Sequence, residues 1–212
     1  MSKARFITLE GLDGAGKSTH LAFIRRYLEQ AGIDTVFTRE PGGTPLGEKL
    51  REILLDIDTE ATLDTETLLM FASRQELVSS LIRPSLAAGR WVVSDRFTDA
   101  TFAYQGGGRG FDWSVLQALE TMVQGGQGGA IRQPDLTVLF LLDPAIAAQR
   151  LAGARVPDKF ESQPVDFFRL VHEGYLRRVE ADPARFARID AAQTREQVWD
   201  AVHAAAAARG WL

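Results

Sequence analysis

Short apolar stretches alternate with amphipathic stretches along the chain. Runs rich in β-branched and aromatic residues, bounded by turn residues, charges or proline, predict strands at Arg5–Glu10, Thr35–Thr38, Trp91–Asp95, Leu136–Leu142 and Phe186–Ile189. Apolar residues recur every three or four positions between them, which predicts helices up to Ala31 and over residues 46–55, 64–87, 112–123, 144–152, 165–180 and 194–209. Such alternation predicts an α/β fold, a parallel sheet of about five strands flanked by helices on both faces.

Composition narrows the class of protein without changing this fold prediction. The chain has 212 residues, of which 45% are hydrophobic and 25% charged, as in an ordinary globular domain, and we expect one domain over residues 1–212. It contains no cysteine, which excludes disulfide scaffolds, cysteine-ligated metals and thiol nucleophiles. A net charge of -4 provides no basic field for nucleic acid or anionic membranes, so neither is an expected partner.

No segment approaches the roughly 20 apolar residues that span a bilayer, and the N-terminus lacks a signal-peptide core. We therefore expect a cytoplasmic protein.

The first predicted strand leads directly into Gly11-x-x-x-x-Gly16-Lys17-Ser18, a P-loop pattern placed between a strand and a helix. Glycines let backbone N–H groups turn toward a phosphate, and the helix start adds partial positive charge. Lys17 is expected to be an exposed, mobile cation, and Ser18 offers an oxygen to Mg²⁺. The pattern predicts a nucleoside triphosphate site formed by Gly11, Asp13, Gly14, Ala15, Gly16, Lys17, Ser18 and Thr19.

The absence of certain sequence signatures excludes two classes of P-loop protein. Outside the P-loop the chain has neither an Asp-x-x-Gly switch nor an Asn-Lys-x-Asp base reader, which a GTPase would need. It also lacks the Leu-Ser-Gly-Gly-Gln signature of ABC-type ATPases. Small nucleotide kinases remain the favoured class.

Charged residues follow two of the predicted strands. Arg39 and Glu40 come after the second strand, and Asp95 and Arg96 end or follow the third. Open α/β sheets bind ligands at these carboxyl ends. There, Asp95 can reach Mg²⁺ through water and Arg96 can bind a phosphate in bidentate fashion. A solvated turn and a structural ion pair are the alternatives.

Arg74 interrupts an apolar stripe of the long predicted helix, one turn after Phe71. A guanidinium on a half-buried face needs acceptors, and an aromatic ring beside it suits a flat base with carbonyl oxygens. Alternatively, Arg74 reaches water or pairs with a glutamate.

Two glycine-rich patches, Gln105–Gly110 and Gln124–Gly129, are interpreted as flexible loops.

Taken in order, these motifs resemble the thymidylate kinase family, which phosphorylates dTMP with ATP. The resemblance rests on the acidic P-loop, Thr38–Thr44, Phe71–Arg74, Asp95–Gln105, Gly106–Gly110, Pro134–Thr137, Asp158–Glu161 and Asp166–Phe168. It implies a P-loop nucleoside monophosphate kinase-like fold with a small lid, Mg²⁺ as cofactor and a homodimer packed through helices. Because Gly14 stands where some members have Arg, the chain resembles the bacterial branch, in which lid residues supply that charge.

The resemblance also implies roles for individual residues. Lys17, Arg96, Arg155 and Asp13 would be catalytic, with Ser18 and Asp95 at the metal and residues 152–163 as the lid. The dTMP site would comprise Asp13, Arg39, Glu40, Pro41, Arg51, Phe71, Arg74, Arg96, Thr101, Tyr104, Gln105 and Phe160. In it, Asp13 holds the 3′-hydroxyl, Arg96 holds the phosphate with help from Arg39 and Arg51, and Phe71 stacks on thymine. Arg74 bonds thymine O4, Thr101 and Gln105 meet its polar edge, and Tyr104 and Phe160 crowd the 2′ position.

Several alternatives stay open at this point. Met70 competes with Phe71 for the stacking position, and Arg150, Arg155 and Lys159 compete for contact with the transferred phosphate. The Gly125–Gly129 insertion has no functional account. A kinase for another nucleotide or a deoxynucleoside, and a non-catalytic nucleotide-binding regulator, are the competing functions.

Overall fold

A computed structural model describes residues 3–126, 130–151, 159–160 and 163–211. Its centre is a five-stranded sheet in which every neighbouring pair is parallel, in the order β2-β3-β1-β4-β5. The strands are β1 (Phe6–Gly11), β2 (Thr35–Arg39), β3 (Trp91–Asp95), β4 (Leu136–Leu141) and β5 (Phe186–Asp190). The predicted α/β class and parallel sheet are confirmed.

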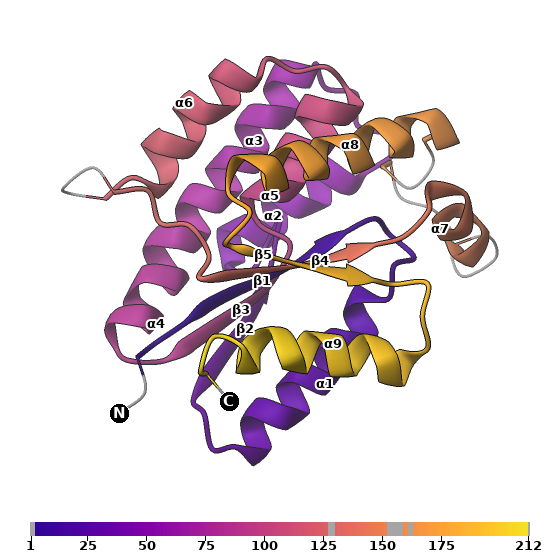
Figure 1. Cartoon of the computed structure of the whole chain (residues 1–212). Helices are drawn as coiled ribbons and strands as arrows, with labels where there is room; N and C mark the ends of the chain where they lie inside the picture. Colours follow the sequence, from indigo (N-terminus) through magenta and orange to yellow (C-terminus); the bar gives the residue numbers. More distant parts are fainter. Residues whose placement is uncertain (1–2, 127–129, 152–158, 161–162, 212) are drawn as a thin grey trace.

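Helices cover both faces of this sheet (Figure 1). The α-helices are α1 (Lys17–Gln30), α2 (Pro45–Leu55), α3 (Leu63–Leu77), α4 (Arg83–Ala87), α5 (Thr98–Thr101), α6 (Trp113–Gln124), α7 (Pro144–Leu151), α8 (Val165–Ala181) and α9 (Arg195–Ala207). Helices α1 and α9 lie on one face, whereas α3, α5, α6 and α8 lie on the other. None of the helices in the described part of the chain is long and apolar enough to cross a membrane.

The long helix predicted over residues 64–87 is interrupted. Helix α3 is followed by a π-helical turn, η1 (Val78–Ile82), and only then by α4. Pro84 lies just after this turn and has no N–H to donate to the preceding turn, so a regular α-helical hydrogen-bond pattern cannot continue through it.

The interpretation of Gln105–Gly110 as a flexible loop is wrong. Residues Phe102–Gly108 form a second π-helical segment, η2, packed against α8. A Cβ on Gly107 would lie 2.6 Å from the Leu170 carbonyl oxygen, and one on Gly174 would lie 2.8 Å from the Cα of Ala103. The glycines therefore permit close helix contact, which positions Tyr104 and Gln105 of η2.

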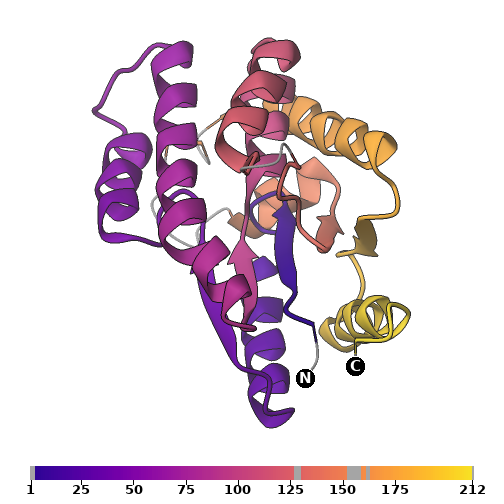
Figure 2. The same cartoon turned by 90° about the vertical axis from the view of Figure 1, so that its left-hand side faces the viewer.

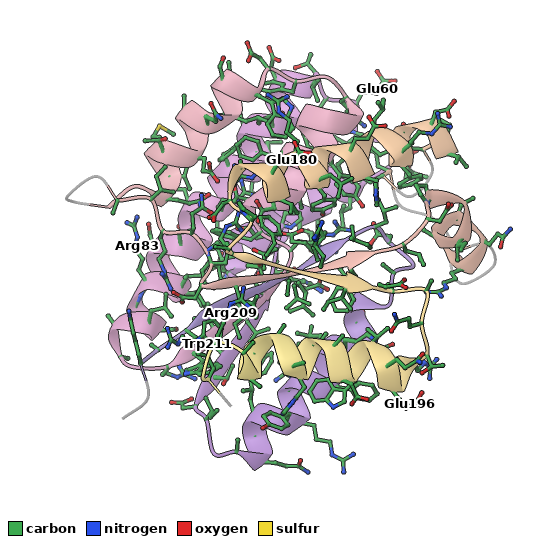
Figure 3. All side chains as sticks on the ribbon, viewed as in Figure 1. Glu60, Arg83, Glu180, Glu196, Arg209 and Trp211 are labelled. Carbon is green, nitrogen blue, oxygen red and sulfur yellow. The ribbon has the colours of Figure 1, made fainter. Side chains whose placement is uncertain are left out.

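The second glycine-rich patch begins at the end of α6. Arg83 donates hydrogen bonds of 2.9 Å to the carbonyl oxygens of Gln124 and Gly125, and Gly125 forms an isolated antiparallel bridge with Ile131. Figure 3 places Arg83 on the side of the molecule away from α7. Residues 127–129 of the predicted loop lie outside the described residues.

The sheet register brings the predicted site motifs together. Leu9 of β1 and Arg39 of β2 both pair with Asp95 of β3, on its two sides. The P-loop follows β1 directly, so the carboxyl ends of three adjacent strands carry the P-loop, Arg39 and the Asp95–Arg96 pair. This edge of the sheet is where an open α/β fold binds ligands.

Candidate active site

A cavity of about 560 Å³ opens at this edge of the sheet. It is lined by the P-loop, the ends of β2 and β3, and parts of α2, α3, α5, η2 and α7. The predicted residues that line it are Asp13, Gly14, Gly16, Lys17, Ser18, Thr19, Arg39, Glu40, Pro41, Arg51, Arg74, Asp95, Arg96, Thr101, Tyr104, Gln105 and Phe160. Gly11, Ala15 and Phe71 do not line it, and Arg155 lies outside the described residues.

Lys17 is buried, which corrects the expectation of an exposed cation. Its side chain is 6% exposed, and Nζ donates 2.9 Å hydrogen bonds to the carbonyl oxygens of Gly11 and Leu12. Burial and the charge of Arg96 lower the pKa of Lys17, and the nearby Asp13 opposes that shift. The ammonium is thus held among P-loop carbonyls, 3.4 Å from Asp13 Oδ1, because the loop wraps around it.

Arg96 and Asp13 form the charged centre of the cavity. Nη2 of Arg96 lies 2.8 Å from both Asp13 carboxylate oxygens and 3.0 Å from the Tyr104 hydroxyl, which in turn donates to Asp13. Burial alone would raise the pKa of Asp13, but the charges of Arg96 and then Lys17 outweigh it and hold that pKa well below its usual range. Asp13 is therefore an anion between two cations at neutral pH.

Arg74 pairs with Glu40, which is one of the alternatives that the sequence left open. Its Nε and Nη2 donate to Glu40 Oε2 at 2.8 and 2.7 Å, and Nη2 also donates to Thr101 Oγ1 at 2.8 Å. Burial raises the pKa of Glu40, and the charge of Arg74 opposes that shift. Nη1 of Arg74 is buried and has no hydrogen-bond partner among the described residues, so two of the five donors of this cavity-lining guanidinium are unsatisfied.

The structure separates the two candidates for the stacking position. Met70 lines the cavity. Phe71 is 2% exposed and belongs to a core cluster with Phe102 and Leu116. Its ring supports Arg74, whose Cζ lies 4.7 Å from the ring centroid. The geometry favours Met70 as the side chain that meets a ligand.

Two further arginines line the cavity from the β2 side. Arg39 forms a 2.7 Å ion pair with Glu48, and both side chains are well exposed. Arg51 on α2 donates to the Pro41 carbonyl oxygen at 2.9 Å. Both residues line the same cavity as Arg96.

The described part of the predicted lid brings one aromatic residue to the cavity. Phe160 lines it and meets the Tyr104 ring edge to face, with centroids 6.1 Å apart. Lys159 forms a 3.2 Å ion pair with the buried Glu66 of α3. Arg150 of α7 lines the cavity and donates to the carbonyl oxygens of Ala191 (3.1 Å) and Gly14 (3.5 Å). Of the three candidate cations, Arg150 is thus the one the structure describes beside the P-loop.

Ser18 and Asp95 fit a role as magnesium ligands. Both line the cavity beside Lys17, and Asp95 Oδ1 is buried with no hydrogen-bond partner among the described residues. The described part of the chain contains no group of three or more His, Cys, Asp or Glu side chains that could hold a metal. Mg²⁺ keeps waters and substrate phosphates as ligands and needs only one or two protein oxygens, a number that Ser18 and Asp95 could supply.

Sequence reasoning missed three residues that organise the cavity from behind. Tyr175 accepts a hydrogen bond from Arg96 Nη1, and Glu10 accepts one from the N–H of Phe97. Glu66 accepts hydrogen bonds from Gln105 (3.0 Å) and Arg109 (3.1 Å). A signal exists for two of them: Glu10 is a charge inside an apolar strand, and Glu66 lies two helical turns before Arg74, on the same helix face. Tyr175 carries no such signal.

Known proteins resemble this chain over most of its length. A family model described as thymidylate kinase matches residues 9–202. The thymidylate kinase of Albidiferax ferrireducens is 59% identical over 210 residues, covering 98% of this chain and 97% of that protein. The thymidylate kinase of Chromobacterium violaceum is 58% identical over 191 residues, covering 90% of this chain and 88% of that protein. A crystal structure of thymidylate kinase from Ehrlichia chaffeensis superposes with a TM-score of 0.76 at 30% identity, covering 96% of this chain and 98% of that one.

Proposed function

The chain belongs to the thymidylate kinase family, and we propose that its cavity is where ATP phosphorylates dTMP to give ADP and dTDP. Its fold is that of a P-loop nucleoside monophosphate kinase. One observation carries the proposal: the P-loop, Arg96 and Arg74 line the same cavity, so a donor phosphate and an acceptor nucleotide have room to meet. Residues 1–212 would act as one kinase domain, with residues 152–163 as its lid.

We assign the acceptor phosphate to Arg96, with Arg39 and Arg51 beside it. Arginine suits this role because its planar donors match phosphate oxygens in pairs. Asp13, an anion next to Arg96, would accept a hydrogen bond from the 3′-hydroxyl of the deoxyribose. The Tyr104 hydroxyl is already engaged by Arg96 and Asp13, so the ring is fixed where it can crowd the 2′ position.

The base would lie between Met70 and the Arg74 guanidinium. Nη1 of Arg74, which has no partner among the described residues, is the donor we assign to thymine O4. Glu40 holds the other side of the guanidinium and so fixes the direction of that donor. Thr101 and Gln105 would meet the polar edge of the base.

The proposed reaction needs no general base. A phosphate monoester has a second pKa near 6, so the attacking oxygen of dTMP is already deprotonated at about pH 7. Catalysis then consists of positioning two anions and neutralising charge, for which we assign Lys17, Arg96 and Arg150 or Arg155. Negative phosphates beside Lys17 would also oppose the burial that lowers its pKa.

We propose Mg²⁺ as the cofactor, held by Ser18 and Asp95 together with phosphate oxygens. When bound, it would neutralise part of the phosphate charge. The Oδ1 atom of Asp95, which has no hydrogen-bond partner in the described part of the chain, supports this assignment.

Deoxyribose selectivity is assigned to Tyr104 and Phe160. The Phe160→Ala variant is expected to lower the preference for dTMP over its ribonucleotide counterpart by about 10-fold, because it removes a ring that fills the space beside C2′. Steady-state kcat/KM for both acceptors gives this ratio. Phe23→Ala, at an exposed ring of α1 outside the cavity, is the matched control. Unchanged discrimination in Phe160→Ala would remove Phe160 from the assignment.

We also propose that the protein is a homodimer and acts in the cytoplasm. Apolar side chains are exposed on two helices that pack together: Leu68 of α3 (56%) and Val115 and Met122 of α6 (43% and 69%). Figure 2 shows α3 and α6 side by side. Sedimentation should give twice the mass of one chain, and Met122→Glu should shift it toward the monomer. A monomeric parent protein at micromolar concentration would contradict the proposal.

The activity itself is tested by ADP release. With ATP, Mg²⁺ and dTMP, we expect ADP to form in proportion to dTDP, and far more slowly with dCMP. Turnover of a different nucleotide in place of dTMP would support the other-kinase alternative. A folded protein that binds ATP and releases no ADP with any acceptor would support the regulator.

A further inference from the structure

Arg96 is held by two buried residues that do not themselves line the cavity. Glu10 lies near the end of β1 and is 0% exposed, and Tyr175 lies on α8 and is 1% exposed. Both are buried polar groups that contact each other. Neither is among the residues assigned above to substrate or metal, and neither lines the cavity.

The first contact fixes the backbone at Arg96. Arg96 has a φ of +67°. Among the described residues, it is the only one other than glycine with a left-handed backbone. That conformation is unfavourable for a residue with a Cβ, so neighbouring groups must stabilise it. Arg96 N–H donates to the Leu9 carbonyl oxygen at 2.9 Å, and the next amide, of Phe97, donates to Glu10 Oε1 at 2.7 Å.

The second contact fixes the guanidinium. Nη1 of Arg96 donates to the Tyr175 hydroxyl at 3.1 Å, and that hydroxyl donates to Glu10 Oε2 at 2.9 Å. A phenol has one proton, so donation to Glu10 leaves the oxygen lone pairs for Arg96. The Glu10 carboxyl group, whose pKa is raised to about 8 by burial and by the charge of Asp99, thus sets both the peptide that follows Arg96 and, through Tyr175, the outer end of its side chain.

From this geometry we propose that Glu10 and Tyr175 are positioning residues, which orient the Arg96 guanidinium toward the phosphate of the acceptor nucleotide. The proposal rests on the proposed function, in which Arg96 binds that phosphate. Asp13 and Tyr104 hold Nη2 from the cavity side, and Tyr175 holds Nη1 from the core side. A guanidinium that is held at both terminal nitrogens loses little rotamer freedom when a phosphate binds. This strengthens phosphate binding and favours phosphoryl transfer.

The test compares dTMP with thymidine, which has the same base and sugar and no phosphate. In Tyr175→Phe the ring is kept and one hydroxyl is removed. We expect the Kd of dTMP, measured by calorimetry, to rise about 10-fold, as for loss of one hydrogen bond to a charged group, while the Kd of thymidine stays unchanged. The kcat should fall as well. Glu10→Ala, which removes both oxygens that contact Phe97 N–H and the Tyr175 hydroxyl, should show the same phosphate-selective loss.

Control variants separate the outcomes. Tyr27→Phe, at the surface between α1 and α9, should bind both ligands as the parent protein does. If Tyr175→Phe weakens the binding of dTMP and of thymidine equally, Tyr175 supports the whole site and the proposal is overturned. It is also overturned if the affinity for dTMP does not change. Arg96→Ala tests the underlying assignment: without a phosphate-selective loss there, Arg96 does not bind the phosphate and the positioning proposal fails with it.

Discussion

Lys17→Ala is expected to lower kcat for dTMP phosphorylation by at least about 100-fold, as does removal of one preorganised charge-stabilising donor in other enzymes. Lys17 Nζ lies among the carbonyl oxygens of Gly11 and Leu12, in the loop assigned to the donor phosphates. The substitution removes that positive charge from the reaction. The dTMP site is formed by other residues, chiefly Arg74 and Arg96, so the Kd of dTMP should change little. The kcat is measured by coupled ADP release.

The burial of Lys17 makes the choice of controls important. Because the side chain is 6% exposed, truncation also removes packing from the P-loop, so Lys17→Met, which keeps an apolar stem, accompanies Lys17→Ala. Lys49→Ala, at an exposed lysine of α2 outside the cavity, is the matched control. Thermal unfolding and dTMP binding verify the fold. Near-normal turnover in a folded Lys17 variant would refute the kinase mechanism proposed for this cavity.

Arg74→Gln should erode discrimination between dTMP and dCMP, which we expect to be about 10-fold to more than 100-fold in the parent protein. Thymine presents an oxygen at position 4 and cytosine an amino group. The guanidinium can only donate, so it bonds the first and opposes the second. A glutamine amide can present either polarity. dUMP, which shares O4 and N3–H with dTMP, should be accepted by the parent.

The ratio of kcat/KM for dTMP to that for dCMP is the measurement. Arg74→Gln leaves the buried Glu40 with a weaker partner and should destabilise the fold, since breaking a buried pair typically costs about 3–5 kcal/mol. The ratio of the two kcat/KM values does not depend on the fraction of active protein, so it can be measured even if the variant is less stable. The Glu40→Gln, Arg74→Gln double variant removes the unpaired charge, and Arg26→Gln on α1 is the surface control. An unchanged ratio would mean that Arg74 does not read the base.

The sequence predicted the elements whose signals are local. Strand β1, the P-loop glycines and the start of α1 form one continuous pattern, and the structure places them as expected. The charged pairs after β2 and β3 also meet at one edge, because parallel strands must end together. The parallel sheet thereby brings two motifs that are far apart in the sequence to the same cavity.

Features that depend on tertiary packing were not predictable in the same way. Glycines in η2 looked like a flexible loop by composition, yet they serve the contact with α8, and only the position of α8 reveals this. Helical periodicity could not choose between Met70 and Phe71, because adjacent positions differ by only 100° around a helix. The burial of Lys17 and the contacts of Tyr175 come from folding of distant segments around them.

A crystal structure with dTMP and a non-hydrolysable ATP analogue tests the central claim most directly. The account predicts that the terminal phosphate of the analogue lies on the P-loop beside Lys17 and that the dTMP phosphate contacts Arg96. It also predicts thymine O4 within hydrogen-bond distance of Arg74 Nη1, with Met70 against the base. A dTMP molecule bound outside this cavity, or bound in it with its base at Arg96 and its phosphate at Arg74, would contradict the account.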